Sequence, residues 1–87
     1  MKADADKLSR LLKTARGQID GILKMMEEDR YCIDISNQLM AIEAIIRKVN
    51  NEVLHQHIDN CVKEAIETGN TSDKLEEIKT IIDKLSK

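Results

Sequence analysis

The sequence has no proline, three glycines and one aromatic residue, Tyr31. Without proline no position enforces a helix break, and without further aromatic rings the core must consist of Ile, Leu, Val, Met and Ala. The 87 residues predict one small domain over 1–87. A glycine-rich phosphate loop and a recognisable nucleophile–base pair are also missing, so we expect no enzyme and no small-molecule substrate.

Long hydrophobic runs are absent as well. No apolar stretch approaches the length of a membrane span, and the polar, charged N-terminus is unlike a signal peptide. We therefore expect a cytoplasmic protein with no membrane partner. In a reducing compartment, two cysteines serve as ligands, redox sensors or buried thiols more often than as a structural disulfide.

Charge is abundant but nearly balanced. Charged residues make up 34% of the chain, and the net charge of −2 gives no overall signal for nucleic acid. Residues 7–16 nevertheless carry four cations and no acid, and a balanced chain with such a segment can present a basic face. The four cations are Lys7, Arg10, Lys13 and Arg16.

The spacing of apolar residues predicts an all-α chain with three helices. The first helix should begin at Asp4 or Asp6 and end near residue 28, and a long second helix should run from about 33 to 67. The second stripe advances in alternating steps of four and three residues, which is typical of a coiled-coil seam. The stripes are Leu8, Leu11, Leu12, Ala15, Ile19, Ile22, Leu23 and Met26; then Ile35, Leu39, Ile42, Ile46, Val49 and Val53; then Leu75, Ile78, Ile82 and Leu85.

Between the second and third stripes, residues 68–73 have the composition of a loop. Gly69 is the expected C-cap of the long helix, and Thr71 or Ser72 is the expected N-cap of a short third helix.

Residues 54–61, LHQHIDNC, bring both histidines and one cysteine into eight residues. His57 and Cys61 are four residues apart, so on a helix they share one face and can grip one metal ion. His55 points roughly to the other side. The pair alone is weak evidence, because this spacing is common by chance and a buried cysteine often acts as a small hydrophobe.

Cys32 precedes Cys61 by 29 residues, which in one continuous helix is about 40 Å. The two thiols can meet only across a two-fold axis. In an antiparallel pair of long helices this axis lies near residues 46–47, the middle of the second stripe. The result is a dimer with two sites, each made of Cys32 from one chain and His57 plus Cys61 from the other. Two thiolates and one imidazole favour Cu(I), with Zn(II) possible as a non-cognate ion if a fourth ligand joins.

Two segments resemble the copper-sensitive operon repressor family, which also contains nickel/cobalt, formaldehyde and persulfide sensors. Residues 17–45 match the family's GQ-x-x-GI…C-x-D…Q-x-x-A block, and residues 57–62 read HIDNCV. The resemblance covers about 7–85, and Cys32, His57 and Cys61 match the ligand pattern of the copper branch.

This resemblance implies a three-helix protomer, an antiparallel four-helix-bundle dimer and a tetramer made of two dimers. It also implies that the metal-free protein binds operator DNA and represses metal-efflux genes until Cu(I) releases it. Tyr31 and Glu77 match positions that surround the copper ligands in the family.

The resemblance implies a DNA-binding face from the first two helices. Lys13 and Lys48 match basic family positions, while Leu11 and Thr14 stand where basic residues are frequent and Arg16 where an acid is usual. Repeated in a tetramer, the basic residues could contact phosphates. The candidate DNA-binding residues are Arg10, Lys13, Arg16, Gln18, Arg47 and Lys48.

Two alternatives remain at this point. Cys32 and Cys61 could form a disulfide or persulfide-derived bridge in a thiol sensor of the same fold, although His57 argues against it. A helical metal-binding oligomer without a DNA function is the other alternative, and the net acidic composition supports it.

Overall fold

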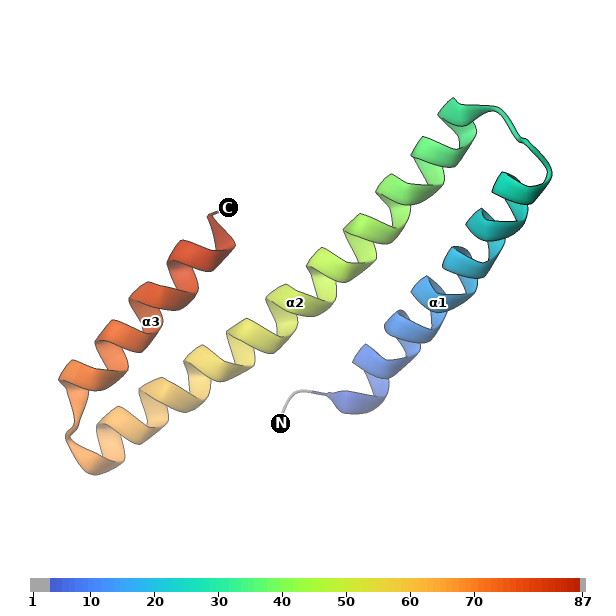
Figure 1. Ribbon diagram of the computed structural model, residues 1–87. Coiled ribbons are helices and arrows are strands. Elements are labelled where there is room, and N and C mark those ends of the chain that lie inside the picture. The colour runs from blue at the N-terminus through green and yellow to red at the C-terminus, as the bar shows by residue number, and fades with distance from the viewer. Residues whose placement is uncertain (1–3, 87) are drawn as a thin grey trace. The chain divides into compact units, whose positions relative to one another are not determined.

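The computed structural model describes residues 4–86, which form three α-helices and no strand. They are α1 (Ala5–Glu27), α2 (Cys32–Thr68) and α3 (Thr71–Leu85), joined by short turns (Figure 1). The all-α prediction is confirmed, and the predicted ends of the long helix are correct to within one residue. None of these helices is both long and apolar enough to cross a bilayer.

The chain forms two compact units, one up to Asn50 and one from Asn51 onward, and α2 contributes to both. Because the two units share one helix, they do not test the prediction of a single domain over 1–87, which stays a prediction.

The start of α1 is capped by the first of the two predicted aspartates. Asp4 Oδ1 accepts a hydrogen bond from the Lys7 backbone N–H at 3.1 Å. This contact satisfies one of the N–H groups that the first turn of a helix leaves without a partner. The helix ends where the Glu28 N–H donates to the Lys24 carbonyl at 3.0 Å. The polar segment that interrupts the apolar pattern therefore becomes the turn to α2.

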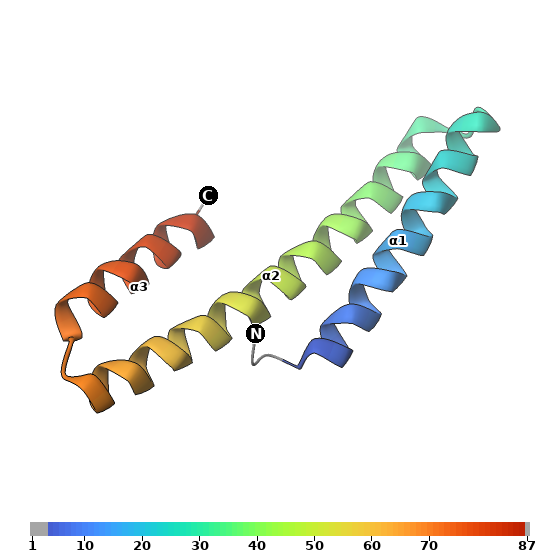
Figure 2. The ribbon, with the colours of Figure 1, turned by 60° about the horizontal axis from the view of Figure 1, so that its bottom comes forward.

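In the first unit, α1 lies antiparallel to the N-terminal part of α2, as the views in Figures 1 and 2 agree. Ala15 and Ile22 of α1 pack with Ile42 of α2 to form a buried cluster. The buried members of the α1 stripe recur every seven residues, so only part of each predicted stripe faces the other helix of the unit. Val49 is buried as well, and Leu11, Ile35 and Val53 are partly buried. The other members are exposed: Leu12, Ile19, Leu23 and Met26 on α1, and Leu39 and Ile46 on α2.

In the second unit, the connection from α2 to α3 is shorter than predicted. Gly69 has a φ of +73°, a left-handed conformation that reverses the chain at little cost without a Cβ. The N-cap of α3 is Asn70, so the expectation of Thr71 or Ser72 was wrong. Because one glycine ends α2, the next polar residues already form the first turn of α3, where Asp73 complements the helix dipole.

The packed face of α3 also differs from the predicted stripe. Ile81 is the buried residue of this helix, with 6% of its surface exposed, whereas Leu75 and Ile82 are 55% and 52% exposed. Ile78 is partly buried and Ile81 is buried, so these two residues lie on the packed face of α3. The stripe identified in the sequence stays largely exposed on the protomer.

Candidate metal centre

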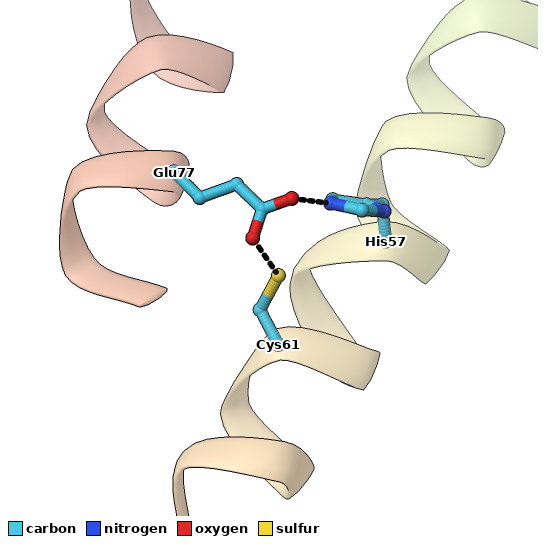
Figure 3. Close-up of side chains that lie close together, drawn as sticks. All are labelled: His57, Cys61 and Glu77. Carbon is cyan, nitrogen blue, oxygen red and sulfur yellow. Dashed lines mark hydrogen bonds and ion pairs between the residues drawn. The ribbon is translucent and has the colours of Figure 1, made fainter. Parts of the chain in front are cut away.

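Two helices of the second unit supply the candidate site. The α-helical repeat places His57 and Cys61 on successive turns of α2, as their spacing predicts. The turn at Gly69 brings α3 back beside them, and Glu77 extends its carboxylate between the two side chains (Figure 3). His57, Cys61 and Glu77 each offer one ligand atom, and these atoms lie within 4.8 Å of one another.

The carboxylate of Glu77 contacts both α2 side chains. Its Oε1 lies 2.5 Å from His57 Nε2, and its Oε2 accepts a hydrogen bond from the Cys61 thiol at 3.3 Å. Cys61 is only 2% exposed, while the side chains of His57 and Glu77 are 47% and 40% exposed. The sulfur is thus enclosed by protein and the other two groups are open to solvent.

The electrostatics of this cluster keep the thiol protonated and the carboxylate ionised. Burial, together with the hydrogen bond to Glu77 and the negative charge of Glu77, raises the pKa of the Cys61 thiol. Hydrogen bonds from His57 and Cys61 lower the pKa of Glu77 below its ordinary value. The metal-free centre therefore contains a neutral thiol that donates to a carboxylate anion.

A lysine and a second glutamate extend the cluster. Lys74 Nζ lies 2.6 Å from Glu64 Oε2 on α2 and 3.7 Å from Glu77 Oε2 on its own helix. Its ammonium group therefore links the two helices through Glu64 and places a positive charge near the Glu77 carboxylate. Sequence reasoning did not identify Lys74 or Glu64; the Lys74–Glu77 spacing of three residues was the available signal, and the contact with Glu64 needs the tertiary structure.

An apolar cavity of about 250 Å³ lies next to the cluster in the second unit. Cys61, Val62 and Lys74 are among its lining residues, and the others are Ala65, Ile66, Thr71, Leu75 and Ile78. Cys61 therefore contacts the Glu77 carboxylate through its sulfur and also lines the apolar cavity.

The other predicted site residues lie outside this cluster. Cys32 and Tyr31 are exposed at the start of α2, in the first unit. His55 is exposed as well and is not part of the cluster, in keeping with its predicted orientation away from His57. The roles predicted for Cys32 and Tyr31 require a second protomer and stay predictions.

The candidate DNA-binding cations lie at the surface. Arg10, Lys13 and Arg16 are exposed on α1, and Arg47 and Lys48 are exposed on α2. Gln18 differs from them, because it is partly buried and its Oε1 is buried without a hydrogen-bond partner in the described part of the chain. The five predicted cations are therefore exposed, whereas the amide oxygen of Gln18 is buried in the first unit.

The helical fold of the described residues and the His–Cys–Glu cluster define a small helical protein with a candidate metal centre. The chain belongs to the metal-sensitive transcriptional repressor family, whose pattern matches residues 4–84. This family consists of transcriptional repressors and not of enzymes.

Similar proteins carry more specific names. A copper-sensing transcriptional repressor CsoR of Mycobacterium ulcerans is 39% identical over 67 residues, which are 77% of this chain and 57% of that protein. A copper-sensing transcriptional repressor CsoR of Bacillus subtilis is 34% identical over 84 residues, or 97% of this chain and 83% of that protein. The chain spans a little over half the length of the mycobacterial relatives, at 57% for the M. ulcerans protein.

Solved structures share the fold. The copper-sensing repressor CsoR with Cu(I) from Geobacillus thermodenitrificans NG80-2 has a TM-score of 0.83 and 37% identity, covering 100% of this chain and 91% of that one. The nickel-responsive transcriptional regulator InrS has a TM-score of 0.86 and 27% identity, covering 98% of this chain and 96% of that one. Fold similarity therefore extends to regulators of two different metals.

Proposed function

We propose that this protein is a Cu(I)-responsive transcriptional repressor that binds operator DNA when metal-free and releases it when Cu(I) binds. The observation that carries the proposal is the convergence of His57 and Cys61 on one face of α2, with Glu77 in contact with both. The names of relatives that are 34–39% identical support copper as the metal. The predicted cytoplasmic location accompanies this role as a prediction.

The donor set of the chain fits Cu(I) when two protomers combine. One protomer brings together a single thiol and a single imidazole, and Cu(I) prefers a second soft ligand. Cys32 is exposed and free, so Cys32 of the partner subunit is the candidate for the second thiolate. The proposed site therefore consists of Cys32 of the partner subunit together with His57 and Cys61. Its two thiolates would match the preference of Cu(I) for sulfur ligands.

The residues of this chain suggest how the site communicates with α3. Cys61 can ligate only as a thiolate, so its thiol must lose the proton that it now donates to Glu77. If His57 ligates through Nε2, this nitrogen must also leave Glu77 Oε1. Both changes remove contacts that hold α3 against α2 in the metal-free protein. Tyr31, next to Cys32, is a candidate neighbour of the completed site.

Operator binding is proposed for the exposed cations of the first unit. Arg10, Lys13 and Arg16 recur at three-residue steps along α1, and Arg47 and Lys48 add two charges on α2. Lysine and arginine side chains bind DNA phosphates and give an affinity that falls with salt. Because binding is reciprocal, DNA must weaken Cu(I) affinity by the same factor as Cu(I) weakens DNA affinity.

An oligomer follows from the apolar surface as well as from the site. Leu39 and Ile46 of the α2 seam are 43% and 47% exposed on the protomer, and a small domain rarely leaves so many large apolar groups in water. We infer that they are covered in an antiparallel dimer, and that two dimers form a tetramer. The axis predicted near residues 46–47 lies within this exposed part of the seam.

The thiol-sensor alternative is less well supported by the environment of Cys61. A thiolate is the reactive species, and burial and Glu77 raise the pKa of this thiol. The oligomer without DNA function is disfavoured because the family is one of transcriptional repressors.

An anaerobic Cu(I) titration of the reduced protein against a chelating competitor tests the proposal. We expect one tight Cu(I) per protomer and a loss of at least about tenfold in affinity for His57→Ala. His55→Ala is the matched control, because His55 is an exposed histidine of the same helix outside the cluster. Binding to DNA from upstream of the protein's own gene should persist in metal-free His57→Ala and lose its response to Cu(I). Absence of tight Cu(I), or equal effects of the two substitutions, would reject the copper site.

A further inference from the structure

The second unit by itself contains a nitrogen, a sulfur and an oxygen donor in one place. His57, Cys61 and Glu77 place these atoms within 4.8 Å of one another without any contribution from Cys32. An imidazole, a thiolate and a carboxylate form a borderline donor set of the kind that Zn(II) accepts. This set differs from the two-thiolate set of the proposed copper site by one ligand.

The three donor groups are already near one another in the metal-free chain. With Zn–N and Zn–O bonds of about 2.0 Å and a Zn–S bond of about 2.3 Å, neighbouring ligand atoms of a tetrahedral site lie about 3.3–3.5 Å apart. In the metal-free chain, Cys61 Sγ lies 3.3 Å from Glu77 Oε2, and His57 Nε2 lies 2.5 Å from Glu77 Oε1. Because the His57–Glu77 contact is shorter than this spacing, these two side chains must move apart for an ion to bind between them.

The surroundings of the cluster suit this occupancy. The side chains of His57 and Glu77 are 47% and 40% exposed, so an ion has a path to the site and a water molecule can take a fourth position. The nearby Lys74 ammonium lies 2.6 Å from Glu64 and 3.7 Å from Glu77, so its closer partner is the other carboxylate. Glu77 is therefore able to act as a ligand.

We propose that each protomer carries a Zn(II) site made of His57, Cys61 and Glu77, complete without Cys32. On binding, the Cys61 thiol releases its proton to solvent, and the resulting thiolate and the Glu77 carboxylate both bind the ion. Glu77 then exchanges its hydrogen bonds with His57 and Cys61 for one bond to the metal. Because Zn(II) accepts carboxylate oxygen and Cu(I) favours sulfur, the same His57–Cys61 pair takes a different third ligand for each metal.

Crossed variants test this assignment on the full-length, reduced protein under anaerobic conditions. The probe is Co(II), whose visible and near-ultraviolet absorption reports tetrahedral geometry and a thiolate bond, followed by displacement with Zn(II). We expect Cys32→Ser to retain the spectrum and the Zn(II) affinity, and Glu77→Gln to weaken both metals by at least about tenfold. Glu76→Gln is the matched control, since this neighbouring carboxylate pairs with Lys79 and is outside the cluster.

The contrary results are equally specific. Loss of the Co(II) thiolate band in Cys32→Ser, or Zn(II) affinity unchanged in Glu77→Gln, would overturn the proposal. Circular dichroism checks that the variants remain helical, and Glu77→Asp, which shortens the carboxylate side chain, repeats the test if Glu77→Gln does not fold. Cu(I) titrations of the same proteins distinguish the two proposals. Loss of Cu(I) binding in Cys32→Ser tests the copper site alone, and the Zn(II) site is judged from the Co(II) and Zn(II) results independently.

Discussion

Glu77 accepts a hydrogen bond from the Cys61 thiol, so that a carboxylate of α3 holds a sulfur of α2 at 3.3 Å (Figure 3). The same carboxylate contacts His57, and it therefore connects both candidate ligands to α3. The first two predictions concern this contact.

The reactivity of Cys61 should depend on Glu77. Burial and Glu77 raise the pKa of the thiol, so Glu77→Gln should lower this pKa and increase the thiolate fraction at a given pH. We expect severalfold faster alkylation of metal-free Cys61, measured by mass spectrometry, with the exposed Cys32 as an internal reference. An alkylation rate of Cys61 that does not change relative to Glu76→Gln would contradict the contact.

Stability in acid should also report on Glu77. Hydrogen bonds from His57 and Cys61 lower the pKa of Glu77 in the folded chain. The resulting stabilisation is present above the unfolded value of about 4.3 and is lost as the pH falls through the lower folded pKa. The free energy of unfolding should therefore decrease below about pH 4.3 more steeply in the wild type than in Glu77→Gln. Parallel pH curves for the two metal-free proteins, obtained by urea unfolding, would argue against this linkage.

Alanine should have opposite effects at two glycines. Gly69 has a φ of +73° and no atom within 4 Å of an added Cβ, so Gly69→Ala should cost about 1 kcal/mol through backbone strain alone. Gly21 lies inside α1 and is also open, so Gly21→Ala should stabilise by about 0.5–1 kcal/mol through helix propensity. Chemical denaturation of both variants checks the signs, and a gain at Gly69 would be incompatible with the left-handed turn.

Two isoleucines one turn apart on α2 should separate folding from association. Ile42 is 8% exposed and belongs to the first unit's core, so Ile42→Ala should cost about 2–4 kcal/mol at any protein concentration. Ile46 is 47% exposed, so Ile46→Ala should act mainly on the oligomer. Its apparent loss of stability should change with protein concentration. Sedimentation and denaturation at two concentrations provide the measurement, and a concentration-independent loss for Ile46→Ala would remove this residue from the interface.

The basic residues of α1 should determine how DNA binding depends on salt. Replacing Arg10, Lys13 or Arg16 by Gln should weaken binding to different DNA sequences by a similar factor. The slope of log affinity against log salt should become shallower by about one unit for each phosphate that the bound oligomer no longer neutralises. Lys63→Gln, an exposed cation of the second unit, serves as the control. A slope that is unchanged in all three variants would move the DNA-binding surface away from α1.

Much of the local structure was predictable from the sequence. The helix ends followed from Asp4 and Gly69, and the adjacency of His57 and Cys61 followed from their spacing, because hydrogen bonds between residues four apart set the helical repeat. The resemblance to a known family placed Glu77 near the ligands. Spacing alone could not have placed it there, since Glu76 and Glu77 have the same local pattern.

The sequence by itself determined three helices, the end of the long helix at Gly69 and one face of α2 with a histidine and a cysteine, because these depend on short-range periodicity and capping. Only the tertiary structure decided which face of α3 meets α2. Ile81 is buried, whereas Leu75 and Ile82 of the more regular stripe are exposed, and the stripe did not predict this rotation of α3. That rotation directs Glu77 to His57 and Cys61, and Lys74 to Glu64. These contacts join residues 10 to 20 positions apart and arise from packing across a turn, so the local pattern carries no record of them.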